Sequence, residues 1–118
     1  KTREIAFESR ISRMEIQTSQ SAMREVFSNL ISNAVKYAEA GSVIKIVCEK
    51  RKLSIWNKGE EIGAQEVPVL FDPFYRRDNE AEGNGMGLYF VKNILTRLGL
   101  RYRFSAYKGG MKFEIWIK

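Results

Sequence analysis

The chain has 118 residues, of which 44% are apolar and 12% aromatic, a composition that predicts one globular domain with its own core. No stretch approaches the roughly 18 consecutive apolar residues of a membrane-spanning helix, and no signal peptide is visible. The formal net charge of +6 is compatible with a nucleic acid, a membrane surface, a nucleotide or an acidic protein as partner, although the basic residues are dispersed and form no tail.

Two residue counts exclude further classes of function. The chain contains no histidine, which excludes histidine-based catalysis within it. Its single cysteine, Cys48, cannot form an internal disulfide and lies in an apolar run. We therefore expect a buried, inert thiol in a protein of a reducing compartment.

The first half of the chain predicts strands around one long helix. Residues 19–38 place apolar side chains at a helical period, and Gly41 suits a left-handed cap at the end of that helix. Before the helix, short strands are expected at residues 4–8 and 11–17. After it, residues 42–49 and 52–56 predict a hairpin.

The second half predicts a turn at residues 57–63, a short helical turn at 67–71 and a polar surface loop at 75–84. A second apolar-periodic helix is expected at residues 88–98, closed by Gly99, and strands at 102–106 and 111–117. No internal repeat or linker is visible. Trp56 and Trp116 are expected to pack on the sheet, and Phe71 and Phe74 to anchor core and loop.

Four residues of the long helix share one face at the edge of its apolar arc, namely Asn29, Asn33, Lys36 and Tyr37. Two asparagines one turn apart are not explained by helix propensity, because asparagine is a mediocre helix former. One interpretation is a polar margin between core and solvent, which is the commoner arrangement. The other is the wall of a site, with carboxamide oxygens for a hard cation and a lysine for anionic oxygens.

A glycine pattern, Gly83-x-Gly85-x-Gly87, comes directly before the second helix and is typical of a phosphate site. Glycines let backbone N–H groups approach an anion, and the helix N-terminus adds a favourable dipole. The pattern is weak evidence by itself. It is not a P-loop, and it follows a charged loop where a dinucleotide-binding motif would follow a strand.

Four motifs in a fixed order give a much stronger signal. They are Asn29-x-x-x-Asn33 with Lys36-Tyr37, then Asn57-x-Gly59, then Phe71-x-Pro73-Phe74-Tyr75-Arg76, and finally Gly83-x-Gly85-x-Gly87-Leu88. The set resembles the N, G1, F and G2 boxes of the catalytic, ATP-binding domain of sensor histidine kinases, in the superfamily shared with gyrase, Hsp90 and MutL. The resemblance covers essentially the whole chain, and NLISNAVKY and GNGMGL are its most specific parts.

The resemblance implies an α/β fold, a two-layer α/β sandwich known as the Bergerat ATP-binding fold. A mixed, mostly antiparallel sheet would be covered on one face by helices, and residues 1–118 would form a single ATP-binding domain. ATP would lie between the helices under a lid at residues 75–84. The implied cofactors are ATP and Mg²⁺.

The resemblance also implies roles for individual residues. Asn33 corresponds to the Mg²⁺ ligand, Asn29 and Lys36 would contact phosphate oxygens, and Tyr37 would pack near the nucleotide. Arg76, in the lid, would approach the γ-phosphate, where negative charge must be stabilised during transfer. Asn29, Lys36 and Arg76 are thus the expected catalytic residues. Further ATP contacts are expected from Asn57, Gly59, Ile62, Phe74, Gly83, Gly85, Met86, Gly87 and Leu88.

The G1 box departs from the family pattern. It usually reads Asp-x-Gly-x-Gly, with the aspartate accepting a hydrogen bond from the adenine amino group, whereas here it reads Asn57-Lys58-Gly59-Glu60-Glu61. Asparagine keeps an acceptor oxygen but loses the charge. Glu61 stands where the second glycine is expected. In the G2 box, Met86 replaces the usual leucine, a tolerable apolar exchange.

The function implied by the resemblance is that of a protein histidine kinase in a two-component system. The domain would transfer the γ-phosphoryl group of Mg·ATP to a histidine on a separate dimerisation domain N-terminal to Lys1. Implied partners are that dimerisation domain, within a homodimer, and a response regulator, without nucleic acid. Membrane attachment would come only from upstream segments, leaving this domain in the cytoplasm beneath an inner or plasma membrane.

Two alternatives remain open from the sequence. One is a serine kinase of the same superfamily, of the anti-sigma-factor type. The other is a degenerate interaction module, with or without nucleotide binding, which the altered G1 box favours slightly.

Overall fold

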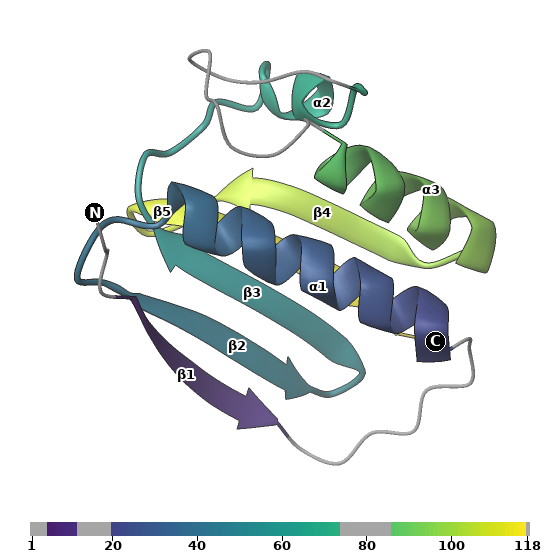
Figure 1. Cartoon of the computed structure of the whole chain (residues 1–118), viewed down its shortest axis with the longest axis horizontal. Coiled ribbons are helices and arrows are strands. Elements are labelled where there is room, and N and C mark those ends of the chain that lie inside the picture. Colours follow the sequence, from purple (N-terminus) through teal and green to yellow (C-terminus); the bar gives the residue numbers. More distant parts are fainter. Residues whose placement is uncertain (1–4, 12–19, 74–85, 118) are drawn as a thin grey trace.

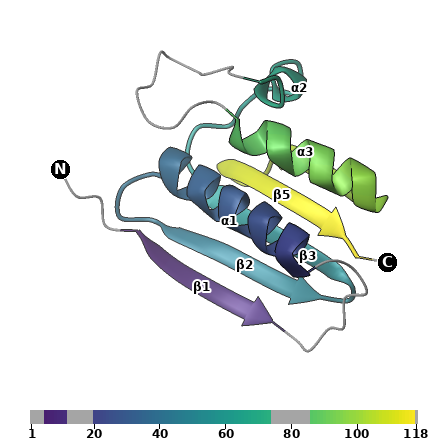
Figure 2. The same ribbon diagram turned by 45° about the vertical axis from the view of Figure 1, so that its right-hand side comes forward.

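The computed structural model describes residues 5–11, 20–73 and 86–117. These residues form one five-stranded sheet with helices on a single face, and the two turned views show the same two layers (Figures 1 and 2). The elements in chain order are β1 (Ala6–Ile11), α1 (Gln20–Tyr37), β2 (Val43–Glu49), β3 (Lys52–Lys58), α2 (Val67–Leu70), α3 (Gly87–Leu98), β4 (Arg101–Ala106) and β5 (Gly110–Trp116).

The sheet has the order β1-β2-β3-β5-β4. Its first pair, β1 with β2, is parallel, and the other three pairs are antiparallel. The predicted two-layer α/β sandwich with a mixed, mostly antiparallel sheet is therefore confirmed. Within the described residues, no helix combines the length and the apolar character needed to cross a membrane.

The core lies between the sheet and the two long helices. The apolar stripes of α1 and α3 supply side chains that are at most 3% exposed, among them Val26, Leu30 and Leu95. Phe71, directly after α2, closes one end of the core with its ring centroid 5.8 Å from that of Tyr102. Phe71 is thus a core residue, as predicted.

One of the two predicted glycine caps is confirmed. Gly99 caps α3 in the left-handed conformation, with a φ of 73°. Gly41 does not cap α1, which ends at Tyr37; it has a φ of 81° in the turn that follows, where the Ser42 N–H donates to Glu39 O at 3.1 Å.

The β2–β3 hairpin turns at Lys50 and Arg51, with φ values of 54° and 58°, which matches the twist of an antiparallel pair. The hairpin turn fixes the register of β3 against β2, and β3 carries the site residue Asn57.

Some sequence predictions were wrong in detail. One strand, β1, covers residues 6–11 where a break was expected after residue 8, because its parallel pairing with β2 runs on without interruption. The rest of the strand predicted at 11–17 lies outside the described residues. Asn57 belongs to β3, opposite Met111, and not to a turn. Cys48 is half-buried, and this burial still raises the pKa of its thiol, which favours the unreactive form.

Candidate nucleotide-binding site

The polar stripe predicted on the long helix forms one edge of α1. Asn29, Asn33, Lys36 and Tyr37 are all half-buried. Asn29 Nδ2 donates to the carbonyl oxygen of Glu25 at 2.9 Å, a bond that leaves its Oδ1 and one N–H without a partner among the described residues. Lys36 Nζ lies 5.3 Å from the centroid of the Tyr37 ring. At ~1.5 Å per residue the stripe extends about 12 Å along the helix, so it is a row of polar groups rather than a point.

One end of this row meets the start of α3. A Cβ atom placed on Gly87 would lie 3.3 Å from Asn29 Oδ1, so the missing side chain lets the first turn of α3 approach the stripe closely. Met86, at the N-cap, provides no side-chain cap for that turn. The first N–H groups of a helix have no intrahelical partner and favour an anion. The structure thus brings the N box and the G2 box together.

The other end of the row meets the end of β3. A Cβ atom on Gly59 would lie 2.5 Å from the carbonyl oxygen of Tyr37, a distance that real Cβ atoms do not tolerate. The same two segments are joined by the backbone of Glu39, whose N–H donates to Lys58 O at 2.8 Å. Asn57 lies just before this junction and is 5% exposed. The G1 box is therefore held against the C-terminal end of α1.

Glu61 has a structural role that the sequence did not reveal. Its Oε2 accepts a hydrogen bond of 2.7 Å from the N–H of Gly109, in the β4–β5 turn. The Gly59 N–H donates to Gly109 O at 3.0 Å. Since Glu61 has no positive φ, this position does not need the glycine of the family pattern. No local signal could have found the contact, because its two residues are 48 positions apart.

The remaining predicted contact residues divide into two groups. Ile62 and Leu88 are 3% and 8% exposed and belong to the hydrophobic core, so they pack beneath the site as core residues. The Ile62 N–H also donates to Met111 Sδ at 3.2 Å. Phe74, Arg76, Gly83 and Gly85 lie outside the described residues. The described part of the site is therefore the α1 edge, the start of α3 and the end of β3.

The donor set fits a magnesium ion that is held mainly by a nucleotide. Among the described residues, no group of three or more His, Cys, Asp or Glu side chains could form a protein-only metal site. Asn33 offers a half-buried carboxamide oxygen on the stripe. Mg²⁺ keeps several waters and takes few protein ligands when phosphates bind it, so one such oxygen is sufficient.

Comparison with known proteins agrees with this arrangement. The family model described as histidine kinase-, DNA gyrase B-, and HSP90-like ATPase matches residues 18–118. Sensor histidine protein kinase HK06 of Streptococcus pneumoniae is 39% identical over 97 residues, which are 80% of this chain and 22% of that protein. Sensor histidine kinase CusS of Escherichia coli is 37% identical over 82 residues, 63% of this chain and 17% of that protein.

A solved structure shows the same fold. The mycobacterial sensor histidine kinase MprB superposes with a TM-score of 0.84 at 24% identity, covering 96% of this chain and 80% of that one. The chain spans about a fifth of the length of the curated relatives that it matches, 22% and 17% in the two cases given.

Proposed function

Because the chain belongs to the family of histidine kinase-, DNA gyrase B- and HSP90-like ATPases, we propose that it acts as the ATP-binding catalytic domain of a sensor histidine kinase. The observation that carries this proposal is the meeting of Asn29 with Gly87, which places the N-terminus of α3, without a side-chain cap from the described residues, at one end of the polar stripe of α1. A helix N-terminus at the start of a row of carboxamides that continues to a lysine suits a chain of phosphates.

In this proposal each part of the site has a chemical task. Lys36 and the first N–H groups of α3 bind phosphate oxygens, and Asn29 orients the phosphates. Asn33 would hold Mg²⁺ through its carboxamide oxygen, and the bound ion would neutralise phosphate charge. Asn57 accepts from the adenine amino group. Arg76, known here only from its motif, stabilises charge on the transferred group.

One feature favours phosphoryl transfer over hydrolysis. Asn29 stands where hydrolytic members of the superfamily carry a glutamate, and a carboxamide has no useful basicity to activate water. Because the chain contains no histidine, the acceptor imidazole of this proposal lies outside it. We place that acceptor on a dimerisation domain of the same protein, with a response regulator as the later partner and the cytoplasm as the compartment.

A degenerate module with weak nucleotide binding is the second candidate. It is favoured by Asn57, which is neutral and 5% exposed at the position of the adenine-binding aspartate. A neutral acceptor contributes roughly 0.5–1.5 kcal/mol, against 1.5–3 for a charged one. The two candidates differ in whether Mg·ATP binding leads to transfer.

Calorimetric titration with ATP, with and without Mg²⁺, tests the binding step. The wild-type chain should bind ATP more tightly with Mg²⁺, and Asn33→Ala should lose about tenfold or more of the Mg²⁺-dependent affinity because one oxygen ligand is gone. Ser32→Ala, an exposed neighbour on α1, is the matched control and should bind like the wild type. Equal Mg²⁺-dependent affinity in Asn33→Ala would contradict the assignment, and no ATP binding by the wild type would contradict the proposed function.

A further inference from the structure

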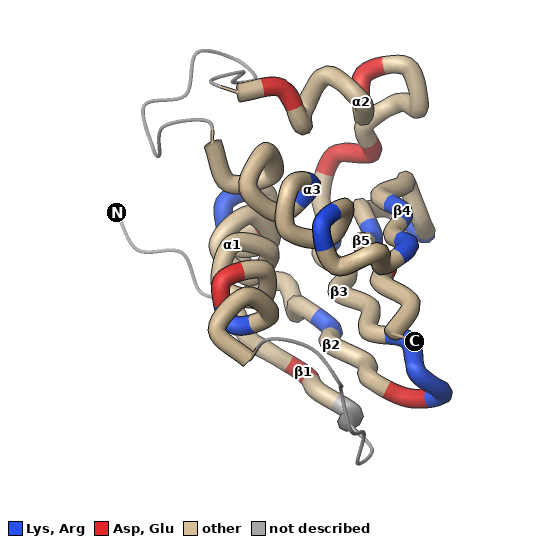
Figure 3. The backbone as a smooth tube through the Cα atoms, turned by 90° about the vertical axis from the view of Figure 1, so that its right-hand side faces the viewer, with Lys and Arg blue, Asp and Glu red and all other residues tan. Residues whose placement is uncertain are grey.

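The sheet face that the helices leave uncovered carries a hollow of about 570 Å³. The sheet itself separates this hollow from the candidate nucleotide site (Figure 2). We call it the basic hollow. It is lined by four lysines and two aromatic side chains, Lys45, Lys52, Lys108, Lys112, Trp56 and Tyr107. Figure 3 shows the backbone positions of Lys and Arg residues along β4 and β5 and in the β2–β3 turn.

Strand register creates the hollow. Residues opposite each other on β2 and β3 form rows across this face, and the middle row consists of the small pair Val47 and Ser54. The row on one side pairs Lys45 with Trp56, and the row on the other side pairs Glu49 with Lys52. Small side chains between two rows of large ones leave a depression whose floor is Val47 and Ser54.

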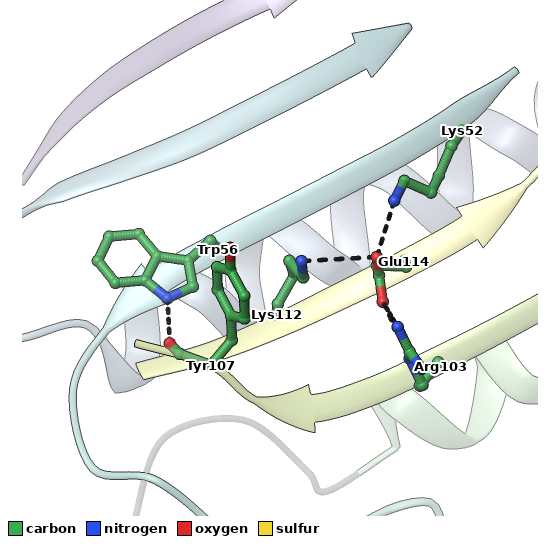
Figure 4. A network of polar contacts seen from close by, with 6 residues as sticks. All are labelled: Lys52, Trp56, Arg103, Tyr107, Lys112 and Glu114. Atoms are coloured by element: carbon green, nitrogen blue, oxygen red, sulfur yellow. Dashed lines mark hydrogen bonds and ion pairs between the residues drawn. The ribbon is translucent and has the colours of Figure 1, made fainter. Parts of the chain in front are cut away.

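The charges of the hollow are only partly neutralised. Glu114, 1% exposed and opposite Ser54 on β5, accepts from Lys52 Nζ at 3.0 Å and from Arg103 at 2.8 Å, and Lys112 Nζ lies 3.6 Å away (Figure 4). Among the described residues, neither Lys45 nor Lys108 forms an ion pair.

The region holds five cations, Lys45, Lys52, Lys108, Lys112 and Arg103, and three carboxylates, which leaves two positive charges in excess. The carboxylates are Glu114 itself, Glu49 in the lining, and Glu8, which is opposite Lys45 on β1. The hollow is therefore complementary to a ligand that carries several negative charges.

The aromatic rings hold the lysines in place. Lys112 Nζ lies 3.7 Å from the centroid of the Tyr107 ring, and Lys45 Nζ lies 5.5 Å from that of Trp56. Trp56 is itself fixed, because its Nε1–H donates to Tyr107 O at 2.7 Å (Figure 4). Since ammonium groups already occupy these ring faces, the hollow is a poor stacking platform for nucleic-acid bases, which favours an acidic peptide over a single-stranded nucleic acid.

We propose that the basic hollow binds an acidic, extended segment of a partner protein. Carboxylates of the segment would reach Lys45 and Lys108, and an apolar side chain would cover the Val47 floor. An extended chain rises ~3.3 Å per residue, so a segment of about nine residues crosses the 29 Å width of the molecule. This binding goes beyond nucleotide chemistry and uses the opposite face of the sheet.

The test uses a fluorescein-labelled peptide of about nine residues, alternating Glu and Asp around one central Leu. Anisotropy with the 118-residue chain at low salt should show binding that weakens as salt is added. The double variant Lys45→Glu with Lys108→Glu should lose about tenfold or more of the affinity, because two attractive contacts become repulsive. Its affinity for Mg·ATP should be unchanged, which separates this proposal from the proposed function.

The matched control makes the same change of charge elsewhere. Lys92→Glu with Arg97→Glu alters two exposed residues of α3 and should bind the peptide within about threefold of the wild type. Equal losses in both double variants would reduce the effect to net charge and overturn the proposal. It would also be overturned by equal binding of a Gln and Asn version of the peptide, by tighter binding of a single-stranded oligonucleotide, or by no peptide binding at low salt.

Discussion

Asn57 is the residue on which the strength of nucleotide binding depends. It lies in β3, 5% exposed, and its Nδ2 is 3.4 Å from Lys58 O, a long and weak hydrogen bond. Its carbonyl oxygen is the acceptor that we assign to the adenine amino group. A neutral acceptor at this position predicts weaker ATP binding than in relatives that carry aspartate.

Asn57→Asp should tighten ATP binding by about tenfold, the difference between a neutral and a charged acceptor. The same change should lower the melting temperature of the nucleotide-free chain, because a carboxylate without a cationic partner becomes buried. Calorimetric titration and thermal unfolding with and without ATP measure the two effects. An aspartate variant that binds ATP no better would show that this side chain does not face the adenine.

Glu114 is the buried charge of the opposite sheet face. Burial by itself raises the pKa of Glu114, but hydrogen bonds from Arg103 and Lys52 and the charge of Lys112 outweigh it, so the pKa lies below its ordinary value of 4.5. A carboxyl group with a lowered folded-state pKa stabilises the fold fully above its unfolded-state pKa. That contribution is lost as the pH falls through the folded-state value.

Glu114→Gln should lower the free energy of unfolding at pH 7 by about 1–3 kcal/mol. The effect stays below that of a fully buried pair because the Arg103 and Lys52 side chains are 62% and 39% exposed. The difference from the wild type should shrink as the pH falls below 4.5, since the wild-type carboxyl group then becomes neutral too. Urea unfolding at several pH values measures this, with Glu25→Gln, exposed on α1, as the control. A difference that does not change with pH would contradict the electrostatic explanation.

Between elements, close backbone contact decides the shape of the site. The end of β3 passes against the end of α1 only because Gly59 has no side chain. Gly110, opposite Lys58, is similarly confined by the Asn57 carbonyl oxygen. These two glycines let three chain segments meet beside the proposed adenine position.

Gly59→Ala should lower the free energy of unfolding by about 1–3 kcal/mol and weaken ATP binding, because its Cβ would force the Tyr37 carbonyl away. Gly63→Ala in the same loop is the matched control. A Cβ at that position meets no atom within 4 Å, so stability should stay within about 0.5 kcal/mol of the wild type. Urea unfolding and ATP titration of both variants provide the comparison. If both behave alike, the close contact at Gly59 does not shape the site.

At the scale of the whole molecule, the proposed reaction needs a second domain that carries the acceptor histidine. The chain lacks histidine, so incubation with labelled ATP should produce no acid-labile, base-stable phosphorylation of the chain itself. The proposed dimerisation hairpin, added as a separate polypeptide, should be labelled slowly, because separate parts lose effective concentration. Arg76→Ala should reduce this labelling further, and Asn33→Ala should abolish it. Self-labelling on serine or threonine would instead identify the serine-kinase alternative.

The sequence by itself determined the long helices, the Gly99 cap of α3 and the four motifs that identify the family. These features depend on contiguous residues, since a helical period, a left-handed cap and a box motif are each read within a few positions. The polar stripe of α1 was therefore predicted residue by residue, and the structure supplied only the segments that it meets.

Only the tertiary structure decided which distant segments lie together. The hydrogen bond from Gly109 to Glu61, the place of Asn57 inside β3 and the basic hollow all depend on strand register. Lys45, Lys52 and Lys112 are dispersed in the sequence and looked like ordinary surface charges. They gather on one face because alternate residues of each strand point to the same side and because β5, the last strand, pairs with β3.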